Sequence, residues 1–327
     1  MSPSTLPTIV IHADWSMHPT RRWMTCARRQ PDGAYLASPP QPVPPLDSFL
    51  QEVQAQVGNH DCALIGLDFT IGLPVEYARL VGVDHFGRFL QQLGDEREQQ
   101  WKHFFEPCED PGQITPYRPF YPLRPGGTRQ THLLDALGLA NINQLRRTCE
   151  RHTPSRKAAS PLFWTLGAQQ IGKAAIAGWR GLLIPALSDP DIHLKIWPFD
   201  GGLFPLFQPG LLIAAEAYPA EYYATLGIRF NRLAGADTAG KRSQAGRAAN
   251  AQVIFDTADR FQLYLQPKLK SMIRQGFGTS STAEDAFDSI IGLLGLVAVL
   301  RGMLPSKAPL SKEKTAIEGW ILGQGAV

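Results

Sequence analysis

Three short apolar runs in this chain each end at an acidic residue, and a longer apolar segment begins with two. The short runs are TIVIHAD, CALIGLD and LLIAAE, which end at Asp14, Asp68 and Glu216. Asp285 and Asp288 open the segment AEDAFDSIIGLLGLVAVL. An acidic side chain at the end of a buried strand is costly unless a metal ion, a cation or hydrogen-bond donors receive it. Four such segments predict an α/β fold that gathers these carboxylates around divalent metal ions.

Composition is that of an ordinary globular protein with a sizeable core. Of the 327 residues, 44% are hydrophobic and 19% are charged. The formal net charge of +3 neither predicts nor excludes nucleic acid, because an enzyme can carry a local basic groove opposite an acidic site. The longest apolar stretch, Ile290 to Leu300, is shorter than the roughly 20 residues that span a bilayer, and the N-terminal residues do not resemble a secretory signal. We therefore expect a cytoplasmic protein with no membrane partner.

The first part of the sequence predicts three consecutive strands, a helix and a further strand. We expect strands over Thr8–Ala13, Arg22–Arg28 and Ala34–Leu36, joined by tight connections as an antiparallel meander. Leu46–Val57 has apolar residues at helical spacing, and Cys62–Phe69 is again a strand. A strand that follows a helix returns naturally as a parallel neighbour, so the predicted sheet is mixed.

We expect a single domain over residues 1–327, with residues 75–190 inserted in it as a mostly helical and loop subdomain. Inside the insertion we expect helices over Phe86–Phe105 and Gln169–Arg180. The elements expected after the insertion are strands over His193–Trp197 and Leu211–Ala217, and helices over Glu221–Leu226, most of Ala239–Leu265 and Ala283–Met303.

The acidic positions suit two-metal phosphoryl transfer, in which several carboxylates converge on Mg²⁺ or Mn²⁺ ions. Hard cations of this kind select oxygen ligands over sulfur or imidazole. The ends of adjacent strands in an α/β sheet lie at one edge, where ligands usually bind. Asp285 and Asp288 are three residues apart, so they share a face of the last long helix.

Each position also has a purely structural interpretation. Asp14 could cap the turn that follows it, and Asp68 could close an Asx turn. Asp285 is ordinary in the first turn of a helix, where acids favour the macrodipole. Glu216 is harder to explain in this way because apolar residues flank it, and Asp288 lies a turn deeper in an apolar helix. The joint pattern favours a metal site.

Two groups of basic residues are candidates for contacts with phosphate. Lys241, Arg242 and Arg247 could neutralise a phosphate backbone, although such a group is usually a solvated helix face. Lys241 or Arg242 would then stabilise the charge on the phosphate under attack. Arg118 and Arg124 lie in a Pro- and Arg-rich loop that also carries aromatic rings, a mixture found on single-strand-binding surfaces and also on ordinary loops.

The chain resembles the DUF429 family of predicted nucleases. The similar pieces occur in the family's order over nearly the whole chain: the Asp14 strand, LDFTIGLP, KIWPFDGG, EAYPAEYYATLG, GKRSQAGR, DAFDSIIGLLGLVA and IEGWILG. The resemblance implies an RNase H-like fold, whose core has the same β-β-β-α-β order and a last acidic helix. It also implies metal-dependent cleavage of a phosphodiester, with Asp14, Asp68, Glu216 and Asp285 or Asp288 as metal ligands. The first motif departs from the family, which usually has a Gly near this Asp, and residues 75–190 carry little that matches.

The leading hypothesis is therefore a nuclease that uses Mg²⁺ or Mn²⁺ and acts on nucleic acid, with DNA or RNA and the oligomeric state left open. Asp14 would lie between two ions, with Asp68 and Glu216 on one side and Asp288, or Asp285, on the other. One alternative is an actin-like phosphotransferase or ATPase, which would need glycine-rich phosphate hairpins. Another is a non-catalytic RNase H-like binding module in which the carboxylates tie strands together.

Overall fold

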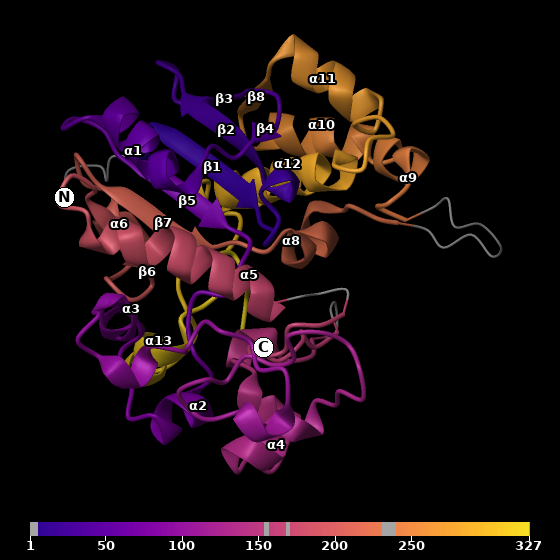
Figure 1. Cartoon of the computed structure of the whole chain (residues 1–327). Helices are drawn as coiled ribbons and strands as arrows, with labels where there is room; N and C mark the ends of the chain where they lie inside the picture. Colours follow the sequence, from indigo (N-terminus) through magenta and orange to yellow (C-terminus); the bar gives the residue numbers. More distant parts are fainter. Residues whose placement is uncertain (1–5, 154–156, 168–170, 231–239, 327) are drawn as a thin grey trace.

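The computed structural model describes residues 6–153, 157–167, 171–230 and 240–326. An eight-stranded mixed sheet lies at its centre, with helices on both faces (Figure 1). The strands are, in spatial order, β6 (Leu194–Trp197), β7 (Leu212–Glu216), β5 (Ala63–Leu67), β1 (Ile9–Asp14), β2 (Trp23–Arg29), β3 (Tyr35–Ala37) and β8 (Leu263–Leu265), and β4 (Gln41–Pro42) pairs with β2.

The predicted meander, helix and parallel strand are confirmed. β1, β2 and β3 pair antiparallel in sequence order. The chain then forms α1 (Leu46–Val57) and returns as β5, which lies parallel to β1. β7 continues the parallel half beside β5, and β6 lies beside β7. The sheet is therefore antiparallel on one side of β1 and parallel on the other.

Side chains that alternate along the strands fill two cores. Ile9 and Ile65 belong to a core that includes α1 and the helices near Trp179, whereas Val10 and Leu64 belong to a core beneath α12. Figure 1 shows α1 and α5 over one face and α12 behind the other. The helices of the α12 face are α8 (Pro219–Leu226), α10 (Ala251–Arg260), α11 (Pro267–Arg274) and α12 (Ala283–Leu300).

α12 lies against β1 and β2 and is buried around its whole circumference, as the sequence predicts. Two glycines allow this close approach. A Cβ atom at Gly292 would lie 2.2 Å from the ring of His12, and one at Gly295 would lie 2.2 Å from the ring of Tyr222. The close packing therefore fixes the position of the acidic first turns of α12 relative to the end of β1.

The described residues between 75 and 190 form helices, turns and isolated bridges. The helices are α2 (Val75–Leu80), α3 (Phe86–Gly94), α4 (Thr131–Leu137), α5 (Ile171–Gly178), a π-helical turn (Trp179–Leu183) and α6 (Ile184–Ser188), with 3-10 turns at Gln99–Trp101, Pro111–Gln113, Ile142–Leu145 and Thr148–Glu150. The inserted-subdomain boundary stays a prediction.

The prediction of one helix over Phe86–Phe105 is wrong, because α3 ends at Gly94. The rings of Phe89 and Trp101 have centroids 5.1 Å apart. A straight helix would separate these residues by about 18 Å along its axis. The chain therefore turns back so that both rings enter the same core. The predicted helix Gln169–Arg180 is present from Ile171, and its first two residues lie outside the described part.

The segment predicted as helix from Ala239 to Leu265 is only partly helical. Its described part contains α9 (Gln244–Ala248) and α10, but Leu263–Leu265 is strand β8, parallel to β3. Leu263 and Leu265 are buried and Tyr264 is 52% exposed, so the local period is that of a strand. Pro267 begins α11. The remaining elements are a 3-10 turn (Pro19–Arg21), α7 (Leu203–Leu206) and α13 (Lys312–Glu318). No helix among the described residues is both long and apolar enough to cross a membrane.

Candidate functional site

The register of β1 and β5 places Asp14 and Asp68 side by side. Ala13 pairs with Leu67 in this parallel ladder, so the next residue of each strand is acidic. The amide of Asp68 donates to the carbonyl of Ala13 at 3.0 Å, and a hydrogen bond joins the side chains of Asp14 and Asp68. Two carboxyl groups in contact need a shared proton or a cation between them.

α12 adds a third carboxylate to this pair. Asp14 follows His12 by two residues, so it points to the same face of the sheet, where the His12 ring meets α12 at Gly292. Burial, and then the charges of Asp288 and Asp68, raise the pKa of Asp14 well above its usual range. Burial, and then the charge of Asp288, raise the pKa of Asp68 to about 8. The three aspartates therefore interact as one electrostatic group, and we call Asp14, Asp68 and Asp288 the aspartate cluster.

Lys241 partly neutralises the aspartate cluster. Its Nζ atom lies 2.8 Å from Oδ2 of Asp288 and 2.9 Å from Oε1 of Glu284. Burial lowers the pKa of Lys241, but Asp288 and Glu284 raise it by more, so the side chain stays an ammonium ion. Burial raises the pKa of Asp288 more than Lys241 lowers it. The hydroxyl of Tyr223 in α8 donates to Oδ1 of Asp288.

Asp285 lies beside the cluster and is paired with an arginine. The Nε and Nη2 atoms of Arg21 donate to its two carboxylate oxygens at 2.5 and 2.8 Å. A two-point contact of this kind orients both groups. Arg21 comes from the 3-10 turn between β1 and β2, so the meander and α12 meet at this ion pair.

Glu216 points to the opposite face of the sheet. In the β5–β7 ladder it pairs with Leu67, one residue before Asp68. Because strand side chains alternate, Glu216 follows Ala214 into the core of the α1 face, while Asp68 lies next to Asp14. Both oxygens of Glu216 accept hydrogen bonds, one from the amide of Ile71 at 2.7 Å and one from Nη2 of Arg147 at 2.6 Å.

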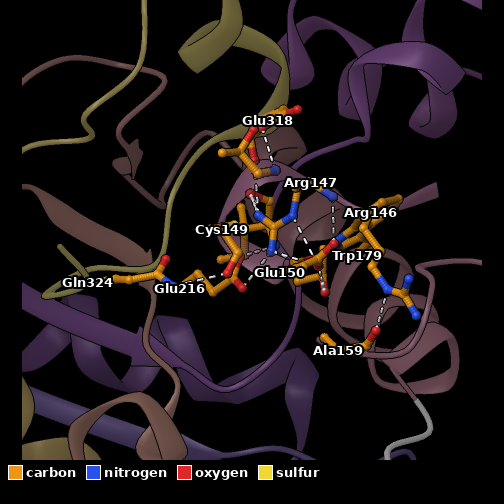
Figure 2. Close-up of polar contacts among 12 residues, drawn as sticks. Arg146, Arg147, Cys149, Glu150, Ala159, Trp179, Glu216, Glu318 and Gln324 are labelled. Atoms are coloured by element: carbon orange, nitrogen blue, oxygen red, sulfur yellow. Dashed lines mark hydrogen bonds and ion pairs between the residues drawn. The ribbon is translucent and has the colours of Figure 1, made fainter. Parts of the chain in front are cut away.

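Arg147 is the centre of a buried polar network, which Figure 2 shows. Its guanidinium is fully buried and contacts the carboxylates of Glu150 and Glu216. It also donates to the carbonyls of Ile71 and Glu318 at 3.0 Å each. Burial raises the pKa of Glu216 more than Arg147 lowers it. The network joins the 3-10 turn Thr148–Glu150, β7, the loop after β5 and the C-terminal segment.

The aspartate cluster and Glu216 both open into one pocket of about 830 Å³. Its wall contains ends of strands β1, β5 and β7, the start of α12, and part of α5. Acidic side chains outnumber basic ones around it: the acids are Asp14, Asp68, Glu150, Glu216, Glu284, Asp285 and Asp288, and the bases are Arg21, Lys173, Lys241, Arg242 and Arg247.

The predicted phosphate-binding residues divide into two groups. Arg242 lines the pocket, and so does Arg247. Arg247 is buried, however, and its three donor nitrogens bind the carbonyls of Lys241, Gly276 and Gly278. Arg118 and Arg124 are not among the described residues that line the pocket; they pair with Glu106 and Glu109. The structure thus brings Lys241 and Arg242 to the carboxylates and leaves the other loop apart.

Sequence reasoning missed Arg21, Arg147 and Tyr223. Arg21 and Arg147 lie in segments without a helical or strand period, so no pattern marks them. Tyr223 lies in EAYPAEYYATLG, one of the pieces on which the resemblance rests, and that motif could have indicated it.

The donor chemistry of the cluster fits a hard divalent cation, since it offers only carboxyl oxygens, and a cation there could replace the protons that the raised pKa values of Asp14 and Asp68 retain. Within the described residues, no group of three or more His, Cys, Asp or Glu side chains is already placed to hold a metal ion. Asp288 instead forms an ion pair with Lys241, and a hydrogen bond joins the side chains of Asp14 and Asp68. The residues therefore fit an ion by type and charge, and binding would replace these contacts.

No protein-family model, curated protein or solved structure matches the chain.

Proposed function

We propose that this protein is a metal-dependent nuclease of RNase H-like fold, which hydrolyses phosphodiester bonds with Mg²⁺ or Mn²⁺. The observation that carries the proposal is the aspartate cluster. Carboxyl groups at the end of β1, just after β5 and in α12 lie together, and the charge of Asp288 raises the pKa of both Asp14 and Asp68. The repulsion among such carboxylates is reduced when a divalent cation takes the place of a shared proton.

Asp14, Asp68 and Asp288 would hold the ion. When bound, the ion would activate a water molecule and stabilise the leaving oxygen of a phosphodiester. The residues of the chain supply the surroundings for this step. Lys241 and Arg242 place positive charge on the pocket wall where a phosphate would enter, and Arg21 holds Asp285 in a fixed orientation.

The order of elements supports the RNase H-like part of the proposal. An antiparallel meander is followed by a helix, a parallel strand beside β1, and a last acidic helix packed against β1. That order is the one implied by the resemblance to the DUF429 family. Nucleic acid is the proposed partner on the same basis.

A specific observation also favours the non-catalytic alternative. Glu216, Asp285 and Asp288 are each paired with an arginine or a lysine, as carboxylates that tie elements together would be. Addition of Mn²⁺ distinguishes the two. A metal site requires that Mn²⁺ raise the melting temperature of the wild-type protein and have less effect on Asp14→Asn, whereas a purely structural cluster gives equal shifts.

The proposed activity is tested on single-stranded, double-stranded and RNA–DNA hybrid oligonucleotides with Mg²⁺ or Mn²⁺. We expect cleavage of at least one of them, lost in Asp14→Asn. Asp256→Asn is the matched control, because Asp256 is exposed on α10 away from the pocket. No cleavage of any substrate by the wild-type protein, or equal cleavage by Asp14→Asn, would overturn the proposal.

A further inference from the structure

The loop that follows Asp68 is irregular and buried, and other segments hold its backbone. The indole Nε1 of Trp179 donates to the carbonyl of Thr70 at 2.6 Å. The amide of Ile71 donates to Glu216 at 2.7 Å, and the carbonyl of Ile71 accepts from Arg147 at 3.0 Å. Buried backbone groups outside regular structure need such partners, so these side chains decide the path of the loop.

Arg147 is suited to this task because a guanidinium carries five N–H donors in a fixed plane. Its Nε and Nη2 atoms bind Oε1 of Glu150 at 3.1 and 3.0 Å, and Nη2 also binds Glu216. Its Nη1 atom binds the carbonyls of Ile71 and Glu318. Lysine has three donors around a single nitrogen and cannot reproduce this planar set.

Glu150 forms a further hydrogen bond to the loop, at Thr70, the residue next to Ile71. Its Oε1 atom accepts from the hydroxyl of Thr70 at 3.1 Å, and its Oε2 atom accepts from the amide of Arg147 at 2.9 Å. Thr70, Glu150 and Arg147 are all buried. Loss of the guanidinium would leave two buried carboxylates without their cation, which is strongly unfavourable.

Asp68 lies two residues before Thr70, and its side chain is turned toward Asp14. The amide of Asp68 donates to the carbonyl of Ala13 in β1. The residues that follow Asp68 form the loop whose Ile71 carbonyl accepts from Arg147. The orientation of the Asp68 carboxyl therefore depends on two anchors, one in the sheet and one in the insertion.

We propose that Arg147 is a positioning residue for the aspartate cluster: together with Glu150 and Glu216 it holds the Thr70–Ile71 loop and so keeps Asp68 beside Asp14. Glu216 acts in this arrangement as the partner of Arg147 and of the Ile71 amide. The inference rests on the proposed function for its catalytic consequence, while the hold on the loop is measurable without any activity.

The hold is tested by amide hydrogen exchange in Arg147→Lys. We expect the protection of the Ile71 amide, relative to that of Ile65 in β5, to fall by about tenfold or more, because the loop opens locally. Arg301→Lys is the matched control. Arg301 also donates to two backbone carbonyls, those of Phe261 and Gly33, but it lies on the far side of the sheet. We expect no change in the relative protection of Ile71 there.

The positioning effect is tested by Mn²⁺ calorimetry and steady-state kinetics on the same variants. Residues that orient metal ligands typically contribute about 10- to 100-fold to affinity or activity. We expect Arg147→Lys to lower Mn²⁺ affinity and kcat in this range, with KM for the oligonucleotide within about twofold because Arg147 is not among the described residues that line the pocket. Thr70→Val, a milder change, should give a smaller effect in the same direction, so the test stands if Arg147→Lys folds poorly.

Two outcomes overturn the inference. One is an Arg147→Lys protein whose melting temperature alone falls, with Ile71 protection, Mn²⁺ affinity and kcat equal to those of Arg301→Lys. The other is unchanged Ile71 protection in both Arg147→Lys and Thr70→Val. A wild-type protein that binds no Mn²⁺ and cleaves no oligonucleotide refutes the proposed function instead, and Ile71 exchange alone then decides whether Arg147 holds the loop.

Discussion

Nζ of Lys241 lies 2.8 Å from Oδ2 of Asp288, so a lysine ammonium already occupies one side of the aspartate cluster. The same nitrogen contacts Glu284, which lies one turn earlier on the same face of α12. A divalent ion on Asp288 would be repelled by this ammonium at close range. Lys241 and the proposed metal ion are therefore expected to compete.

Lys241→Met should bind Mn²⁺ more tightly than the wild-type protein, by about tenfold or more, because a nearby positive charge is removed from the site. Without metal it should be less stable by about 1–3 kcal/mol, because Asp288 loses a charged hydrogen-bond donor. Calorimetry and urea denaturation measure the two effects. Lys268→Met, an exposed position on α11, is the control. Unchanged or weaker Mn²⁺ binding in Lys241→Met contradicts the competition.

Asp68→Asn should be more stable than the wild-type protein at pH 8 when no metal is present. The pKa of Asp68 is about 8 in the folded protein and 3.8 in its reference state, so the folded state keeps a proton that the unfolded state has lost. The contribution of Asp68 to the free energy of unfolding is greatest below pH 4 and decreases as the pH rises to 8. We expect a gain of at least about 1 kcal/mol at pH 8, which shrinks toward pH 4. Urea denaturation in the presence of a chelator measures this gain. A variant that is less stable than the wild-type protein at pH 8 would contradict the raised pKa of Asp68.

His12 should make the protein less stable in acid. Its pKa is lowered to about 4, chiefly by burial, and its Nε2–H donates to the carbonyl of Ala217 at 3.1 Å. Between pH 6.5 and pH 4, His12 is protonated in the unfolded chain but neutral in the folded chain. The free energy of unfolding is therefore highest above pH 6.5 and falls as the pH is lowered.

The size of this effect is about 2 kcal/mol between pH 7 and pH 5. Comparison with His12→Gln isolates it, because other groups titrate equally in both proteins. The free energy of unfolding of the wild-type protein should fall more than that of the variant over this range. Parallel curves would show that His12 protonates equally in both states.

Gly295→Ala should destabilise the protein by about 1–3 kcal/mol or more, since an added methyl group in a packed core forces side chains or backbone to shift. The new Cβ would lie 2.2 Å from the ring of Tyr222. Gly112→Ala is the control, because nothing lies within 4 Å of a Cβ there, and it should change stability by less than about 0.5 kcal/mol. Equal unfolding free energies for the two variants would mean that α12 does not lie this close to α8.

The sheet and half of the site could be predicted from local pattern. Apolar runs with a period of two, separated by turns, identify β1, β2 and β5, and the spacing of α1 is matched to the residue. Asp14 and Asp68 end neighbouring strands of equal register, so the expectation that they meet follows from the two runs alone.

Glu216 shows where such reasoning stops. It ends a run just like the other two, but β7 pairs with β5 one residue out of step, and this turns its side chain to the opposite face. Register between strands that are distant in sequence is decided by packing of the whole sheet. The partners of the acids were not predictable either, because Arg147 and Lys241 come from turns whose place in space depends on the packing of distant segments.

The hydrogen bonds from Arg147 to Glu318 and from the amide of Leu322 to the carbonyl of Glu216, 2.8 Å long, place the C-terminal segment in the wall behind the pocket. During synthesis a domain generally folds as a unit, so its last segments must be present before its fold is complete. A ribosome-bound chain that already displays Asp14 and Asp68 would still lack these last partners. The wall of the pocket, which includes Ile321, is thus complete only after translation has passed residue 322, long after Asp14 and Asp68 have been synthesised.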